Sequence, residues 1–134
     1  MHDTTAIDYL QPIRLYLFSR YEVDILFKDP KMAKFFNSSK ELVKTHGPER
    51  AKKIRLRLDQ LSNAIHLKEY LSLQPRCHVL TGDLKGIWSS DLDKQYRLLF
   101  EVADDPIPID SYNQLDLGKV KSVRIIDVTD THTP

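Results

Sequence analysis

The chain has 134 residues, which is enough for one domain with a single hydrophobic core and too few for two comfortable ones. Its apolar fraction of 41% and charged fraction of 29% are ordinary for a globular protein and exclude a disordered or fibrous class. No apolar run is long enough to span a bilayer, and the stretch 13–18 is too short for a secretory signal core. The single cysteine, Cys77, excludes an internal disulfide and a cysteine-based zinc site. We therefore expect a cytoplasmic protein with no membrane partner.

The net charge of +1 hides an uneven distribution of charge along the chain. Residues 28–97 contain 15 Lys and Arg against 8 Asp and Glu, whereas residues 104–134 contain 3 against 6. A basic body followed by an acidic segment is typical of a protein with a surface that binds polyanions.

The first segment, residues 1–20, differs from the rest of the chain and precedes the first clear strand pattern. Its apolar residues have the spacing of an amphipathic helix, namely Ile7, Leu10, Ile13 and Leu17. The segment is either such an accessory helix or an extension with no role in the chemistry. We treat it as separate from a main domain at residues 21–134.

Residues 21–27 alternate apolar and acidic side chains, which predicts a half-buried strand. Residues 31–46 are predicted to form a helix in two pieces, because Ser38 and Glu41 have the spacing of a capping box. Gly47 is expected to end the second piece. Residues 48–65 then form another helix with one apolar face, made of Ala51, Ile54, Leu58, Leu61 and Ile65.

Four short strands are predicted in the second half of the chain, at residues 76–80, 86–92, 95–102 and 120–128. The first three are joined by tight turns, so consecutive strands should pair antiparallel. Residues 103–119 form an Asp- and Pro-rich connection, expected to be flexible and solvated and not catalytic, that contains Asp104, Asp105 and Asp110. The order β-α-α-β-β-β-β predicts an α+β domain, with helices on one face of a curved, mainly antiparallel sheet.

This order and five local segments resemble the RelE/ParE superfamily, and within it the HigB-like killer proteins of plasmid-maintenance systems. The segments are YEVDILFK (21–28), ELVKTHGPERAKKIRLRLDQL (41–61), RCHVL followed by GDLKG (76–86), WSSDLDKQYRLLF (88–100) and VRIIDVTDTH (123–132). The resemblance covers nearly everything from residue 21 onward and implies a RelE-like fold.

The resemblance also implies a function: a toxin of a type II toxin–antitoxin system. Such toxins are typically metal-independent endoribonucleases that cleave mRNA on the ribosome and need no cofactor. The implied partner is a cognate antitoxin, HigA-like and carrying a helix-turn-helix, and promoter DNA is bound only through the toxin–antitoxin complex. ParE-like relatives of the same fold instead poison DNA gyrase, so the fold does not by itself define the activity.

Cleaving RNA without a metal requires a base, an acid and cations that stabilise the phosphorane. By resemblance, His132 with Asp130 supplies proton transfer, since an imidazole with a pKa near ~6.5 titrates at working pH. Thr131 stands where the family has an aromatic residue. The alternative for His132 is a solvated histidine in the C-terminal tail with no catalytic role. Arg97 and Lys85 match a phosphate-binding arginine and a lysine near the scissile phosphate. The alternative for Arg97 is a side chain whose stem covers the sheet edge or that pairs with a nearby carboxylate. Without the family resemblance, the more common role of a turn lysine such as Lys85 is a solvated one.

Three further residues are candidates for binding RNA phosphates. Arg76 and His78 are two apart on a predicted strand and so share one face, while Cys77 points into the core. Arg124 is either part of the cationic wall or a member of an ion pair. The basic surface of helix 48–65 is either solvated or binds ribosomal RNA. Trp88 is expected in the core, and no cluster of residues has metal-ligand spacing.

Two alternatives to a nuclease remain open at this stage. A non-nuclease toxin of the same fold, such as a gyrase inhibitor, would not need Asp130 or His132. A degenerate module that only binds its antitoxin is compatible with the substitution at Thr131.

Overall fold

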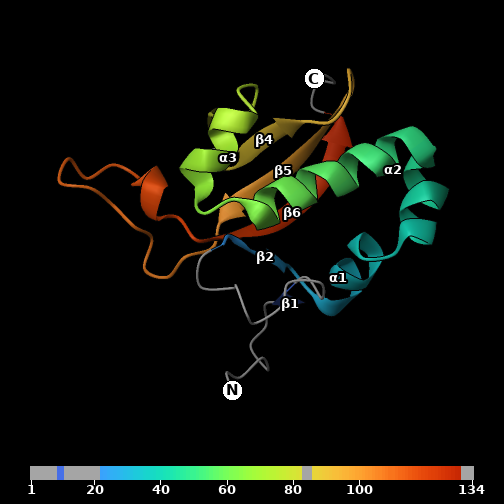
Figure 1. Ribbon diagram of the computed structural model, residues 1–134, viewed down its shortest axis with the longest axis horizontal. Helices are drawn as coiled ribbons and strands as arrows, with labels where there is room; N and C mark the ends of the chain where they lie inside the picture. The colour runs from blue at the N-terminus through green and yellow to red at the C-terminus, as the bar shows by residue number, and fades with distance from the viewer. Residues whose placement is uncertain (1–8, 11–21, 83–85, 131–134) are drawn as a thin grey trace.

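The computed structural model describes residues 9–10, 22–82 and 86–130 of the chain. Its framework is a six-stranded sheet with the strand order β1-β2-β6-β5-β4-β3 (Figure 1). The strands are β1 (Tyr9–Leu10), β2 (Asp24–Phe27), β3 (His78–Val79), β4 (Trp88–Asp91), β5 (Tyr96–Val102) and β6 (Ser122–Asp130). The predicted α+β class, with helices on a mainly antiparallel sheet, is confirmed.

The strand pairing brings the two ends of the domain together at the middle of the sheet. Strands β3, β4, β5 and β6 pair antiparallel in chain order, as their turns predict. Strand β2 pairs parallel with β6, and β1 adds to the other edge of β2 in antiparallel direction. A bulge between Leu99 and Phe100 shifts the register of β5 against β6.

Three helices lie on one face of this sheet in the described part of the chain. Helix α1 spans Pro30–Phe36, α2 spans Ser39–Asn63 and α3 spans Leu67–Leu73. The Ser38 hydroxyl accepts a 3.1 Å hydrogen bond from the backbone N–H of Glu41, which is the predicted cap. Gly47 has φ 82° and ψ 161°, so α2 is kinked there, as the Gly47-Pro48 pair predicts.

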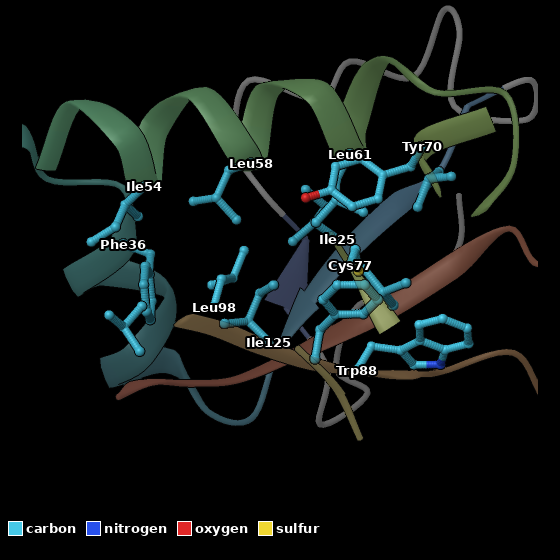
Figure 2. Packing of buried hydrophobic residues seen from close by; sticks show 14 of the residues in the cluster. Ile25, Phe36, Ile54, Leu58, Leu61, Tyr70, Cys77, Trp88, Leu98 and Ile125 are labelled. Carbon is cyan, nitrogen blue, oxygen red and sulfur yellow. The ribbon is translucent and has the colours of Figure 1, made fainter. Parts of the chain in front are cut away.

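The core lies between α2 and the sheet (Figure 2). Ile54, Leu58 and Leu61 of α2 are fully buried, which confirms the predicted apolar face, although Ile65 is 52% exposed. Alternate residues of the strands meet them, among them Ile25, Leu98 and Ile125. Trp88 is also buried and stacks on Phe100 at a ring-centroid distance of 6.4 Å, so it belongs to the core as expected.

Helix α3 is absent from the elements that the sequence predicts. Its N-cap is His66, whose Nδ1 accepts a 3.2 Å hydrogen bond from the backbone N–H of Glu69, and histidine is not among the usual capping residues. Three of the predicted strands are shorter than expected: residues 21–27, 76–80 and 86–92 contribute only β2, β3 and β4.

The first segment contains a strand where a helix was one of the two expectations. Tyr9–Leu10 forms β1, so the helical alternative is wrong at these two residues; the remainder of residues 1–20 lies outside the described part of the chain. The pairing of β1 with β2 adds backbone hydrogen bonds that an amphipathic helix would not make at this edge.

The connection between β5 and β6 is more ordered than its composition predicts. Asp104 is half-buried, and its carboxylate accepts hydrogen bonds of 2.8–3.2 Å from the backbone N–H groups of Lys121 and Ser122 and from the Ser122 hydroxyl. Asp110 accepts bonds from the N–H groups of Tyr112 and Gln114. The expected solvated loop is therefore wrong for Asp104, which anchors the start of β6.

Candidate RNA-binding site on the open face of the sheet

The face of the sheet away from the helices carries a group of polar and charged side chains. Residues that pair across antiparallel strands point to the same face. Arg97 on β5 pairs with Asp91 on β4, and Ser89 on β4 pairs with His78 on β3. Since the neighbouring Leu98 and Phe100 point into the core, Arg97, Asp91 and His78 share the open face.

The Asp91 carboxylate is the centre of this group. One of its oxygens forms an ion pair with Nε of Arg97 at 2.8 Å, and the other accepts a hydrogen bond from Nε of Arg76. The backbone carbonyl of Asp91 accepts a 2.8 Å bond from Nε of Arg57, which reaches over from α2. Three guanidinium groups from separate parts of the chain are thus joined by one residue.

Arg97 is held more firmly than a surface arginine. Its side chain is only 12% exposed, and its Nη1 group also donates to the backbone carbonyls of Asp93 and Tyr96 at 2.9 and 3.0 Å. Arg76, in contrast, has a side chain that is 78% exposed, and its bond to Asp91 raises its pKa. The site therefore combines a fixed cation, Arg97, with a second cation, Arg76, that is anchored at Nε and open to solvent.

Two adjoining hollows lie around these arginines, and both are lined by Arg76, Asp91 and Arg97. One, of about 410 Å³, extends toward His78 and Ser89. The other, of about 420 Å³, extends over the β4–β5 turn and is lined by Arg57, Leu92, Asp93 and Lys94 as well. Cations at the rim of a shallow polar hollow are suited to binding a phosphodiester chain.

Arg57 and Lys94 are members of this surface that the sequence analysis did not single out. Arg57 precedes the buried Leu58 and therefore lies at the border of the apolar face of α2. A basic residue at that border is expected to direct its side chain toward the edge of the sheet. The sequence analysis considered the basic residues of the helix only as a group and did not use this position.

A second cluster fixes α2 against the same turn. Nε of Arg50 is 2.8 Å from the Asp93 carboxylate, and the Arg50 guanidinium lies 3.6 Å from the centre of the Tyr96 ring. His46 packs near Tyr96, with a ring-centroid distance of 6.3 Å, and burial, with the charge of Arg50, lowers its pKa. These contacts tie the β4–β5 turn and the start of β5, which carries Arg97, to the helix layer.

The structure groups Arg76, His78 and Arg97 but separates two other candidates from them. Arg124 pairs with Glu101 at 3.0 Å, so its structural alternative is observed. Arg124 pairs in register with Glu101, which is four residues, or about 13 Å, from Arg97 along β5. Asp130 pairs in register with Tyr96, whose ring faces the helices, so Asp130 does not share the face of Arg97. Lys85 and His132 lie outside the described residues.

The buried side of the site contains inert polar groups. The Tyr70 hydroxyl is hydrogen-bonded to the Ser90 hydroxyl at 2.6 Å, and burial raises the pKa of Tyr70. Cys77 is buried as predicted, and burial raises the pKa of its thiol to about 12. A thiol with this pKa is protonated at neutral pH and therefore a poor nucleophile.

Neither a metal-binding cluster nor a membrane-spanning helix is found in the described part of the chain. Residues 9–10, 22–82 and 86–130 contain no group of three or more His, Cys, Asp and Glu side chains arranged to hold a metal ion. None of the helices in this part of the chain is both long and apolar enough to cross a bilayer.

Helices on one face of a mainly antiparallel sheet, with arginines on the open face, are the arrangement that the sequence predicts for a RelE-like toxin. A family model described as the RelE-like toxin HigB of type II toxin–antitoxin systems matches residues 25–116, which is more than half of the chain. The chain belongs to the HigB-like toxin family. A search of the curated proteins found no match. The matched residues include Arg76, His78, Lys85 and Arg97 but end before β6.

Proposed function

We propose that this HigB-like toxin is a ribosome-dependent endoribonuclease that cleaves mRNA in the cytoplasm without a metal ion. The observation that carries the proposal is the grouping of Arg76, Arg97 and His78 around a hollow on the open face of the sheet. These side chains offer several donors to one phosphodiester. Guanidinium groups suit this task because they stay charged and present forked donors.

The proposed reaction is attack of the ribose 2′-oxygen on the adjacent phosphorus. The 2′-O–P bond forms, the P–O5′ bond breaks, and the products are a 2′,3′-cyclic phosphate and a 5′-hydroxyl. Arg97 and Arg76 stabilise the charge on the phosphorane, and His78 contacts the phosphate. Following the family resemblance, we assign Lys85 a place near the scissile phosphate, and His132 the proton transfer to or from the reacting oxygens. Asp130, which does not share the face of Arg97, acts in this proposal only by orienting His132.

We propose that the antitoxin partner, a HigA-like helix-turn-helix protein, silences the toxin by covering or neutralising this cationic face. Charge complementarity at such an interface favours an acidic segment of the antitoxin. In this proposal the toxin contacts promoter DNA only as part of the complex with its antitoxin.

The test is induction of the protein without an antitoxin in bacteria, followed by pulse labelling. We expect protein synthesis to stop while the DNA stays supercoiled, with mRNA cut only where it is engaged by ribosomes. Loss of supercoiling while synthesis continues would identify a gyrase inhibitor. The variant His132→Ala should relieve the growth arrest; an arrest of wild-type strength would exclude His132 from the chemistry.

A further inference from the structure

A carboxylate at the centre of a cationic site has two opposing effects on an RNA phosphate. Its negative charge repels the phosphate and so weakens binding. Its contacts, however, fix arginine side chains that would otherwise have many rotamers, and ordering such a side chain costs conformational entropy. The contacts of Asp91 indicate which effect dominates.

Asp91 contacts both arginines at their Nε atoms, each through a different carboxylate oxygen. One carboxylate oxygen forms an ion pair with Nε of Arg97 at 2.8 Å, and the other accepts a hydrogen bond from Nε of Arg76. A contact at Nε restricts the orientation of the guanidinium plane. For Arg76 the terminal Nη groups have no hydrogen-bond partner among the described residues, and the side chain is 78% exposed. Asp91 thus restrains Arg76 without covering the end that would contact a phosphate.

Asp91 is itself rigidly placed. It ends β4 in register with Arg97, its side chain is only 19% exposed, and its carbonyl accepts from Nε of Arg57 on α2. Both the strand and the helix layer therefore define the position of the carboxylate before any RNA arrives. Arrangement of catalytic groups in advance of binding lowers the barrier of the reaction.

We propose that Asp91 is a positioning residue of the RNA-cleaving site, which holds the guanidinium groups of Arg76 and Arg97 in the arrangement that stabilises the phosphorane. The inference rests on the proposed nuclease function. It adds a residue that touches neither the RNA nor the reacting atoms and acts through the two arginines.

The test is the variant Asp91→Asn, assayed for binding and for single-turnover cleavage of mRNA on programmed ribosomes. Removing a negative charge should leave the affinity unchanged or higher, whereas the cleavage rate at saturation should fall about 10- to 100-fold. If Asp91 only repelled the RNA or only supported the fold, Asp91→Asn would raise the cleavage rate at saturation or leave it unchanged. A rate at saturation equal to or above that of the wild type therefore overturns the proposal.

Glu101→Gln is the matched control, because it removes the same charge from the same sheet, at the ion pair with Arg124. We expect it to cleave at the wild-type rate. A loss equal to that of Asp91→Asn would mean that the charge of the face, and not the hold on the arginines, sets the rate. If Asp91→Asn does not fold, Asp91→Glu replaces it. This variant keeps the carboxylate but displaces it by one methylene, so we expect it to cleave mRNA more slowly than the wild type. An unchanged rate would contradict the positioning role.

A double-mutant cycle with Arg76→Ala separates this inference from the nuclease proposal. Arg76 is exposed, so its removal should not affect folding. In the Asp91→Asn background Arg76→Ala should cost less activity than it does alone, and additive losses would contradict the coupling. A wild-type protein that cuts no mRNA on ribosomes rejects the proposed function itself.

Discussion

Arg97 has both a structural role and a proposed catalytic one. Its Nε forms an ion pair with Asp91, and its Nη1 group donates to two backbone carbonyls. The same side chain lines both hollows, where we propose that it contacts the phosphate. In the sequence analysis these were alternatives: a phosphate-binding arginine or one that pairs with a carboxylate. The ion pair is observed, and the phosphate contact stays a prediction. An arginine fixed by protein contacts is also better prepared to bind a transition state than a mobile one.

We predict that Arg97→Ala lowers the single-turnover rate of mRNA cleavage by about 10²–10⁴-fold, because it removes a cation from the phosphorane. Arg97→Lys keeps the charge but loses the planar fork, and it should recover only part of the rate. Thermal denaturation of both variants provides the folding control, since Asp91 keeps its contact with Arg76. Cleavage by Arg97→Ala at the wild-type rate would remove Arg97 from the active site.

Cys77 makes a pH-dependent contribution to stability. Burial raises the pKa of its thiol in the folded protein to about 12, above the value of 9.0 for an exposed thiol. The contribution is therefore complete below pH 9 and is lost progressively as the pH rises from 9 toward 12, where only the unfolded chain ionises. Urea denaturation at pH 7 and pH 10 should show a smaller loss of stability in Cys77→Ala than in the wild type. An equal loss would contradict this assignment.

At the level of elements, the kink in α2 depends on Gly47. Its φ of 82° with ψ of 161° is a conformation that is essentially restricted to glycine. An added Cβ would meet no atom within 4 Å, so the cost of a side chain there is backbone strain alone. We predict that Gly47→Ala destabilises the fold by about 1–3 kcal/mol in a denaturant titration.

Gly118→Ala is the control for this prediction, because Gly118 does not have a positive φ and an added Cβ would make only an ordinary 3.8 Å contact with Asp116. It should change the stability far less than Gly47→Ala. Equal effects of the two substitutions would show that the kink at Gly47 does not carry the strain.

Strand β1 pairs with the outer edge of β2, far in strand order from β4 and β5. We therefore propose that residues 1–20 protect the fold and take no part in the chemistry. A variant that begins at residue 21 should cleave mRNA at the wild-type rate but expose the edge of β2, and light scattering should detect self-association. A loss of cleavage in the folded, monomeric variant would contradict this separation.

The sequence predicted the elements whose signals are local. Ser38 and Gly47 mark the ends of helical segments by their own side chains, and the spacing of Ile54, Leu58 and Leu61 defines a buried face. Helix α3 was missed because its cap is His66 and its length is only two turns. The parallel pairing of β2 with β6 depends on residues about one hundred positions apart, which no local pattern encodes.

The candidate site follows the same division. The strand periodicity predicted that His78 lies on the surface while Cys77 is buried. It did not predict the role of Asp91, because a carboxylate between two arginines is recognised only after three strands and a turn have been assembled. Nor did it predict that Asp130 pairs with Tyr96, since that depends on the bulge in β5 and β6 and on their register.

At the level of the whole molecule, the family, the α+β fold and the cationic open face are consistent with one another. The helices and the core face of the sheet bury the apolar residues, and the opposite face is left to the charged ones. This division gives a small protein a rigid surface on which cations are held by strands and by an adjacent helix. Such a surface suits the substrate that we propose, an mRNA that the ribosome holds in position.

The central claim is metal-independent cleavage of mRNA on the ribosome, and the most direct measurement is single-turnover cleavage of a 5′-labelled mRNA on programmed ribosomes. The protein is first treated with EDTA and desalted, so that the ribosomes keep their magnesium. We predict cleavage at the same rate with treated and untreated protein, a product ending in 2′,3′-cyclic phosphate, and little cleavage of free mRNA. Intact mRNA in the presence of folded wild-type protein, or activity restored only by an added transition metal, would contradict the account.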